Sequence, residues 1–332
     1  MRPMAKAARL VPFTAFCLVA GFSPCLAQPK TGIAFGISAR KGPAATAGPV
    51  KTIRVNGVQL AYVDRGHGEP IVLAHGFLHD YRVWPAQVET LSKQYRVIAY
   101  SQRYRYPFAP APENADISRA ASVEDLAALI QRLKLGRVHL VGHSGGAALI
   151  LSLARKHPHL VRSLVLGEGP PPLSVAAGEK ATAPPPPAFV LEARQAYDRG
   201  DREGAIRTFA QGVLGKDRPL PPRPSLREIP LDNAWQLRTL GVRDTSEAPF
   251  TCDDARRIQA PALVVRGELS PPVQHANAEA WRNCAPAVEH AVLSGASHGL
   301  QIENPAGFNE IVSQFLARQH QRTRAQRLPS QR

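Results

Sequence analysis

The sequence feature that most constrains this chain is a short apolar run that ends in a glycine-rich turn. Residues 138–141 read Val-His-Leu-Val, residues 142–146 read Gly-His-Ser-Gly-Gly, and a helical pattern begins at Ala147. This order predicts a strand, a strained turn with Ser144 at its tip, and a helix, because side chains at the flanking glycines would clash. The helix directs its first N–H groups and its dipole toward Ser144, so the pattern predicts a nucleophile beside an oxyanion site.

Apolar runs that suit buried strands alternate with helical patterns on both sides of this turn. The predicted strands after the first hairpin are 70–74, 95–100, 138–141, 163–166, 262–266 and 288–293. Continuous apolar runs are typical of strands buried on both faces of a parallel sheet. Two earlier runs, 53–55 and 60–63, flank Asn56-Gly57 and predict a β-hairpin. The predicted fold class is therefore α/β, with a mainly parallel sheet flanked by helices.

The alternation is interrupted once, and both ends of the chain differ in composition from the rest. Between residues 170 and 260, prolines separate short helical patterns, which predicts an inserted helical lid. The core is expected in two parts, 51–169 and 261–318. A flexible linker is expected at 28–50, and a basic disordered tail is expected at 319–332.

The first 27 residues have the parts of a secretory signal peptide. A basic start is followed by an apolar segment, 10–22, which is too short to span a bilayer comfortably, and Ala27 offers a cleavage site. We therefore expect a periplasmic or secreted protein, with an uncleaved membrane anchor as the alternative. The mature chain keeps Cys252 and Cys284, which are compatible with one disulfide or with two separate thiols.

Charge and motif content restrict the expected partners. The formal net charge is +15, and the tail contributes arginines without one acid. Such a tail is more typical of a solvated segment than of a binding surface. The sequence contains no nucleic-acid motif, no metal-ligand cluster and no dinucleotide fingerprint. It therefore predicts a small-molecule substrate, no cofactor or metal, no nucleic-acid partner and no transmembrane segment in the mature chain, and it leaves the oligomeric state open.

A serine nucleophile needs a base, an orienting acid and oxyanion donors. His298 is the best candidate for the base, because it stands in Gly-Ala-Ser-His-Gly after the last predicted strand. Small neighbours there would let the imidazole reach over the edge of the sheet.

Together these residues resemble the α/β-hydrolase fold superfamily over about residues 51–318. The marks are His75-Gly76-Phe77 after an early strand, the turn around Ser144, the inserted lid, and His298 near the end. The nucleophile comes first and the histidine last, as in that family. The resemblance implies that the backbone N–H groups of Phe77 and Gly145 form the oxyanion hole.

The acid departs from the commonest pattern of the family. Residues 267–270 read Gly-Glu-Leu-Ser, so Ser270 stands where most members carry an aspartate, and serine cannot supply a negative charge. In some α/β-hydrolases the acid follows the next strand after the helix that begins behind the nucleophile. In this chain that strand is 163–166, and Glu168 stands just after it. We predict Glu168 as the triad acid and Glu268 as the second choice, with a dyad or an inactive site as the remaining alternatives.

The residues predict an exported serine hydrolase, similar to carboxylesterases and lipases. It would cleave an ester or related acyl bond of a small or lipophilic substrate through an acyl-enzyme intermediate. Dehalogenation and epoxide hydrolysis in this family use an aspartate nucleophile, so Ser144 disfavours both. The alternative is a non-catalytic ligand-binding protein on the same fold, and peroxidase-like or C–C bond hydrolysis on the same triad also stays open.

Overall fold

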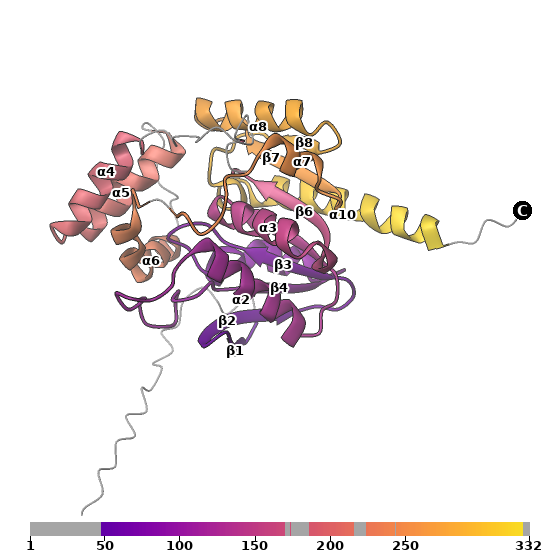
Figure 1. Ribbon diagram of the computed structural model, residues 1–332, viewed down its shortest axis with the longest axis horizontal. Coiled ribbons are helices and arrows are strands. Elements are labelled where there is room, and N and C mark those ends of the chain that lie inside the picture. The colour runs from indigo at the N-terminus through magenta and orange to yellow at the C-terminus, as the bar shows by residue number, and fades with distance from the viewer. Residues whose placement is uncertain (1–47, 170–172, 174–185, 216–223, 243, 328–332) are drawn as a thin grey trace, which may run out of the picture. The chain divides into compact units, whose positions relative to one another are not determined.

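An eight-stranded sheet forms the centre of the fold (Figure 1). The computed structural model describes residues 48–327 apart from 170–172, 174–185, 216–223 and 243. The strands are β1 (Val50–Val55), β2 (Val58–Arg65), β3 (Pro70–Ala74), β4 (Arg96–Tyr100), β5 (Val138–His143), β6 (Val161–Gly167), β7 (Ala262–Gly267) and β8 (Glu289–Leu293). Their order is β1-β2-β4-β3-β5-β6-β7-β8. β2 pairs antiparallel with β1 and β4, and all other pairs are parallel.

Helices cover both faces of this sheet, because the central strands are apolar on both faces. Every residue of β5 is buried. On one face lie α1 (Pro85–Leu91) and α10 (Pro305–Arg327), whose side chains pack with Ile71, Val141 and Val265. On the other face lie α2 (Arg119–Arg132), α3 (Gly145–Lys156) and α8 (Pro272–Cys284). The predicted α/β class with a mainly parallel sheet is confirmed.

The helical insertion lies between β6 and β7. Its described elements are α4 (Ala188–Asp198), α5 (Arg202–Leu214), α6 (Pro224–Asp232) and the 3-10 helix η4 (Ala234–Thr239). They gather beside one end of the sheet (Figure 1). A short helix, α7 (Cys252–Arg256), leads back to β7.

Of the predicted disordered tail at 319–332, the structure describes residues 319–327, and these are helical. Helix α10 continues to Arg327 and extends away from the sheet (Figure 1). The reason is local, since residues 319–327 contain neither glycine nor proline and the first breaker is Pro329. The predicted signal peptide at 1–27 and nearly all of the predicted linker lie outside the described residues. Within the described part of the chain, no helix is long and apolar enough to cross a membrane.

The sequence did not decide between a disulfide and two separate thiols, and the structure has the disulfide. A disulfide links Cys252 at the start of α7 to Cys284 at the end of α8. Beside it, the rings of Phe250 and Trp281 stack with centroids 5.8 Å apart. The bond therefore ties the return from the insertion to the helix that follows β7.

Replacing both Cys252 and Cys284 with serine is expected to lower the free energy of unfolding. The half-cystines are separated by 32 positions, and closing a loop of that length restricts the unfolded chain by about 3–4 kcal/mol. Urea unfolding of the oxidised wild type, the reduced wild type and the double variant measures this difference. Equal stability of all three, or two free thiols by mass analysis of the native protein, would contradict the expectation.

Candidate active site

Ser144 stands at the tip of the turn between β5 and α3, with φ 54° and ψ −121°. A left-handed φ at a residue other than glycine costs about 1–3 kcal/mol and persists only where the surroundings enforce it. The turn is enforced by packing, because a Cβ atom on Gly146 would lie 2.1 Å from the carbonyl oxygen of Ala74. The backbone N–H of Ser144 also donates to the carbonyl of Gly167 at 2.8 Å. The turn that the sequence predicts is therefore present, and it exposes the serine hydroxyl beyond the end of the sheet.

The loops at the carboxyl ends of the strands bring a histidine and a carboxylate to this serine. His298, in the loop after β8, places Nε2 3.1 Å from Ser144 Oγ. Its Nδ1 lies 3.3 Å from Oε2 of Glu168, which directly follows β6. Glu168 is 2% exposed and His298 is 8% exposed. When Nδ1–H donates to the carboxylate, the lone pair on Nε2 accepts the serine proton, and this is the tautomer that general-base catalysis requires.

Glu268 lies apart from this group. It is exposed, and its Oε2 accepts hydrogen bonds from Ser294 Oγ at 2.7 Å and from the backbone N–H of Gly295 at 2.9 Å. The hydrogen bond from Gly295 lowers the pKa of Glu268. Between the two carboxylates that the sequence proposes, the structure brings only Glu168 to His298.

Ser270, at the position where most members of the family carry an aspartate, contacts Glu168, the predicted acid. Its hydroxyl donates to Oε1 of Glu168 at 2.6 Å, and the backbone N–H of Gly267 donates to the same oxygen at 2.6 Å. Aspartate at position 270 would place a second carboxylate against Glu168, with mutual repulsion. The sequence did not predict that Ser270 binds Glu168. The available signal was a small hydroxyl residue at the position where an aspartate is usual.

Replacing Ser270 with alanine is expected to lower kcat about ten-fold. Its hydroxyl supplies one of the two hydrogen bonds that fix Oε1 of Glu168, and a hydrogen bond to a charged group contributes about 1.5–3 kcal/mol. Steady-state hydrolysis of a p-nitrophenyl ester measures the change. Ser294→Ala is the matched control, because that hydroxyl donates to Glu268 instead. Similar losses in both variants would rule out a specific role for Ser270.

The two predicted oxyanion donors lie on segments that meet beside Ser144. Gly145 is the first residue of α3, and a Cβ atom placed on it would lie 3.9 Å from the backbone nitrogen of Phe77. Phe77 belongs to the oxyanion loop, residues 75–80, which follows β3. Backbone N–H groups near a helix N-terminus stabilise developing negative charge. The arrangement is suited to an oxyanion on a substrate attacked by Ser144.

Two buried histidines hold the loops of this site. His143 Nε2 donates to the backbone carbonyl of His298 at 2.6 Å, and burial holds the pKa of His143 well below its usual value. His75 Nε2 accepts from the backbone N–H of Gln102 at 3.0 Å, and its Nδ1 lies 2.9 Å from the carbonyl of Gly76. Burial lowers the pKa of His75 to about 3. Both rings are therefore neutral at pH 7, and each fixes a loop rather than acting as a base.

A cavity of about 460 Å³ opens at Ser144 between the sheet and the insertion. Ser144 and His298 line one side, and apolar side chains of the insertion line the other, among them Ile206, Phe209 and Leu231. Among the described residues, no group of three or more His, Cys, Asp or Glu side chains could hold a metal ion. The cavity is suited to a largely apolar organic molecule with one reactive group at the serine.

Comparison with known proteins agrees with this fold. Residues 69–305 match the family model described as alpha/beta hydrolase fold. A non-heme haloperoxidase from Rhodococcus erythropolis is 29% identical over 280 residues, covering 79% of this chain and 97% of the relative. A 2-(acetamidomethylene)succinate hydrolase from Mesorhizobium japonicum is 26% identical, covering 80% of this chain and 94% of the relative.

Solved structures agree as well. A thermophilic esterase from Thermogutta terrifontis superposes with a TM-score of 0.64 at 25% identity, covering 82% of this chain and all of that one. A bromoperoxidase from Bacillus anthracis superposes with a TM-score of 0.66 at 23% identity, covering 81% of this chain and all of that one. The family match covers more than half of the chain, so the chain belongs to the α/β-hydrolase fold family.

Proposed function

We propose that this protein is a serine hydrolase that cleaves an ester or related acyl bond of a small or lipophilic substrate. The observation that carries the proposal is the continuous set of contacts from Glu168 through His298 to Ser144 at the floor of an apolar cavity. A non-catalytic binding protein would have no need to preserve this set of contacts. The esterase among the structural relatives adds support by analogy.

The geometry supports a two-step reaction. Ser144 Oγ attacks the acyl carbon while its proton passes to His298 Nε2, and the resulting oxyanion accepts hydrogen bonds from the N–H groups of Phe77 and Gly145. Glu168 stabilises the imidazolium. The C–O bond to the alcohol then breaks, and the alcohol leaves with the proton from His298. Water, deprotonated by His298, attacks the acyl-enzyme, and the acid is released as Ser144 regains its proton.

Labelling with a fluorophosphonate, followed by a series of p-nitrophenyl esters, tests this function. We expect one phosphonyl group per chain, on Ser144, and none on the unfolded protein. Each methylene that enters the apolar cavity contributes about 0.8 kcal/mol. Values of kcat/KM should therefore rise up to about four-fold per methylene from acetate to butyrate. A folded protein that is neither labelled nor active on any of these esters would overturn the proposal in favour of a binding protein.

We also propose that the protein is exported. The signal-peptide pattern of residues 1–27 supports this, and so does the disulfide between Cys252 and Cys284, because such bonds persist in oxidising compartments. The test is to recover the protein from outside the cytoplasm and to determine its first residue by mass analysis. A chain that begins at Gln28 is expected outside the cytoplasm. Recovery of the chain only in the cytoplasm would contradict export, and an uncut chain outside the cytoplasm would indicate the membrane anchor instead.

A further inference from the structure

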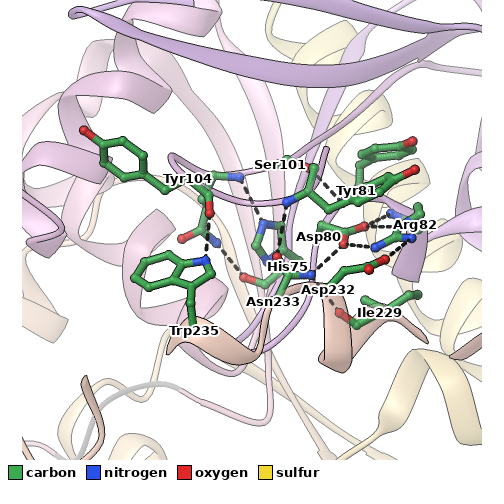
Figure 2. Close-up of polar contacts among 12 residues, drawn as sticks. His75, Asp80, Tyr81, Arg82, Ser101, Tyr104, Ile229, Asp232, Asn233 and Trp235 are labelled. Carbon is green, nitrogen blue, oxygen red and sulfur yellow. Dashed lines mark hydrogen bonds and ion pairs between the residues drawn. The ribbon is translucent and has the colours of Figure 1, made fainter. Parts of the chain in front are cut away.

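The insertion holds the oxyanion loop at two buried points. Gln236 Oε1, on η4, accepts a hydrogen bond from the backbone N–H of Leu78 at 3.1 Å. Asn233 Nδ2 donates to Asp80 Oδ2 at 2.7 Å (Figure 2). Gln236 is 1% exposed and Asn233 is fully buried. Because water has little access to either place, the position of the loop depends on the residues at and just before η4.

The first contact holds a strained residue next to an oxyanion donor. Leu78 has φ 59°, and a hydrogen bond from the N–H of His79 to the carbonyl of Gly76 closes a turn around it. In a type II turn the third residue has a positive φ, and glycine is preferred at that residue. Leucine costs about 1–2 kcal/mol there. The hydrogen bond to Gln236 opposes the rotation of the Phe77–Leu78 peptide that would relieve this strain.

The second contact belongs to a charged cluster that joins the insertion to the core. Asp80 accepts hydrogen bonds from Arg82 Nε at 2.9 Å and Nη2 at 2.7 Å. Arg82 Nη1 lies 2.9 Å from Asp232, the last residue of α6 (Figure 2). Asn233 also accepts from the backbone N–H of Tyr106 at 3.2 Å and donates to the carbonyl of Ile229 at 2.8 Å. Both the oxygen and the nitrogen of the Asn233 amide therefore have other hydrogen-bond partners that orient the group toward Asp80.

The side chains of the same loop complete the apolar core of the insertion. Leu78 packs with Ala234 and Leu237, and the Phe77 ring lies with its centroid 5.1 Å from that of Phe209 on α5. The ring of Phe77 therefore packs against the insertion, while its backbone nitrogen lies beside Gly145. A shift of the insertion would move this donor.

We propose that Gln236 and Asn233 are positioning residues of the oxyanion hole. They hold residues 77–80 in the conformation that presents the Phe77 N–H to the substrate oxygen. The inserted helices are then part of the support of the active site as well as one wall of its cavity. This inference rests on the proposed hydrolase function, because an oxyanion hole has a role only in such a reaction.

The test is Gln236→Met, which keeps the side-chain volume and removes the amide acceptor. One oxyanion donor contributes about 100- to 1000-fold in kcat. Because Phe77 would be displaced rather than lost, we expect kcat to fall about ten-fold while KM stays within about three-fold. Adding Leu78→Gly should restore part of kcat, since glycine takes a positive φ without strain. Hydrogen exchange of the peptide spanning 75–80 should become faster in Gln236→Met.

Arg238→Met is the matched control on the same helix. Its guanidinium donates to the carbonyls of Ala111 and Pro112, away from the oxyanion loop, so kcat and exchange of residues 75–80 should not change. Equal effects in both variants, or no effect of Gln236→Met on either readout, would overturn the proposal. If Gln236→Met does not fold, Asn233→Ser carries the same test at the second contact. If the wild type cleaves no ester, the hydrolase function fails, and hydrogen exchange still decides whether Gln236 holds the loop.

Discussion

Replacing Ser144 with alanine is expected to lower kcat by about 10⁵-fold or more, the loss seen when a triad serine is removed in a well-studied protease. The reason is that the hydroxyl supplies the bond to the acyl carbon, and among the described residues no other hydroxyl is hydrogen-bonded to His298. The left-handed φ of 54° at this position remains strained with alanine, so the folded state should keep about its wild-type stability. Hydrolysis of p-nitrophenyl butyrate measures the loss of activity. Intact-mass analysis after fluorophosphonate treatment measures the loss of labelling.

A buried serine on the helix that follows Ser144 is the control for this substitution. Ser152, on α3, is 3% exposed and donates to Glu247 Oε2 at 2.6 Å, away from the triad. We expect Ser152→Ala to change stability but not labelling. If Ser144→Ala kept more than a small fraction of wild-type kcat, or were still labelled at one site per chain, the nucleophile would have to be sought elsewhere.

Replacing Glu168 with glutamine is expected to lower kcat by about 10³- to 10⁴-fold, as the corresponding amide substitution does in a serine protease. The structure gives a specific reason. Oε1 accepts from the backbone N–H of Gly267 and from Ser270, so the amide oxygen of glutamine must take that position. Its NH₂ group then faces His298 Nδ1, which must accept instead of donate. The proton moves to Nε2, and His298 can no longer take the proton of Ser144.

The comparison with Glu268→Gln decides which carboxylate is the acid. Glu268 is exposed and bonded to Ser294 and Gly295, so its amide variant should keep kcat within about two-fold of the wild type. A thermal melt of both variants separates loss of fold from loss of activity. If Glu268→Gln lost most of its kcat while Glu168→Gln kept it, the assignment of the acid would be reversed.

Local patterns in the sequence were sufficient for the sheet, because short-range apolar runs specify buried strands. The run at 138–141 and the glycines around Ser144 predict a strand and a strained turn, and both are present. The Asn56-Gly57 pair predicts the hairpin of β1 and β2, with φ of 44° and 82° at the two turn residues. The basic charge of the last residues was interpreted as a tail, although the lack of glycine and proline before Pro329 also favours the helix that α10 forms to Arg327.

The sequence by itself determined the strand order along the chain, the strained turn at Ser144, and the residue types from which a nucleophile, base and acid could come. The tertiary structure decided which carboxylate faces His298, what Ser270 does, and how the insertion holds the oxyanion loop. Ser270 and Glu168 are 102 positions apart, and Leu78 and Gln236 are 158 apart. The physical reason is that hydrogen bonds act over about 3 Å, so only the folded arrangement of β6, β7 and the inserted helices brings these groups within reach.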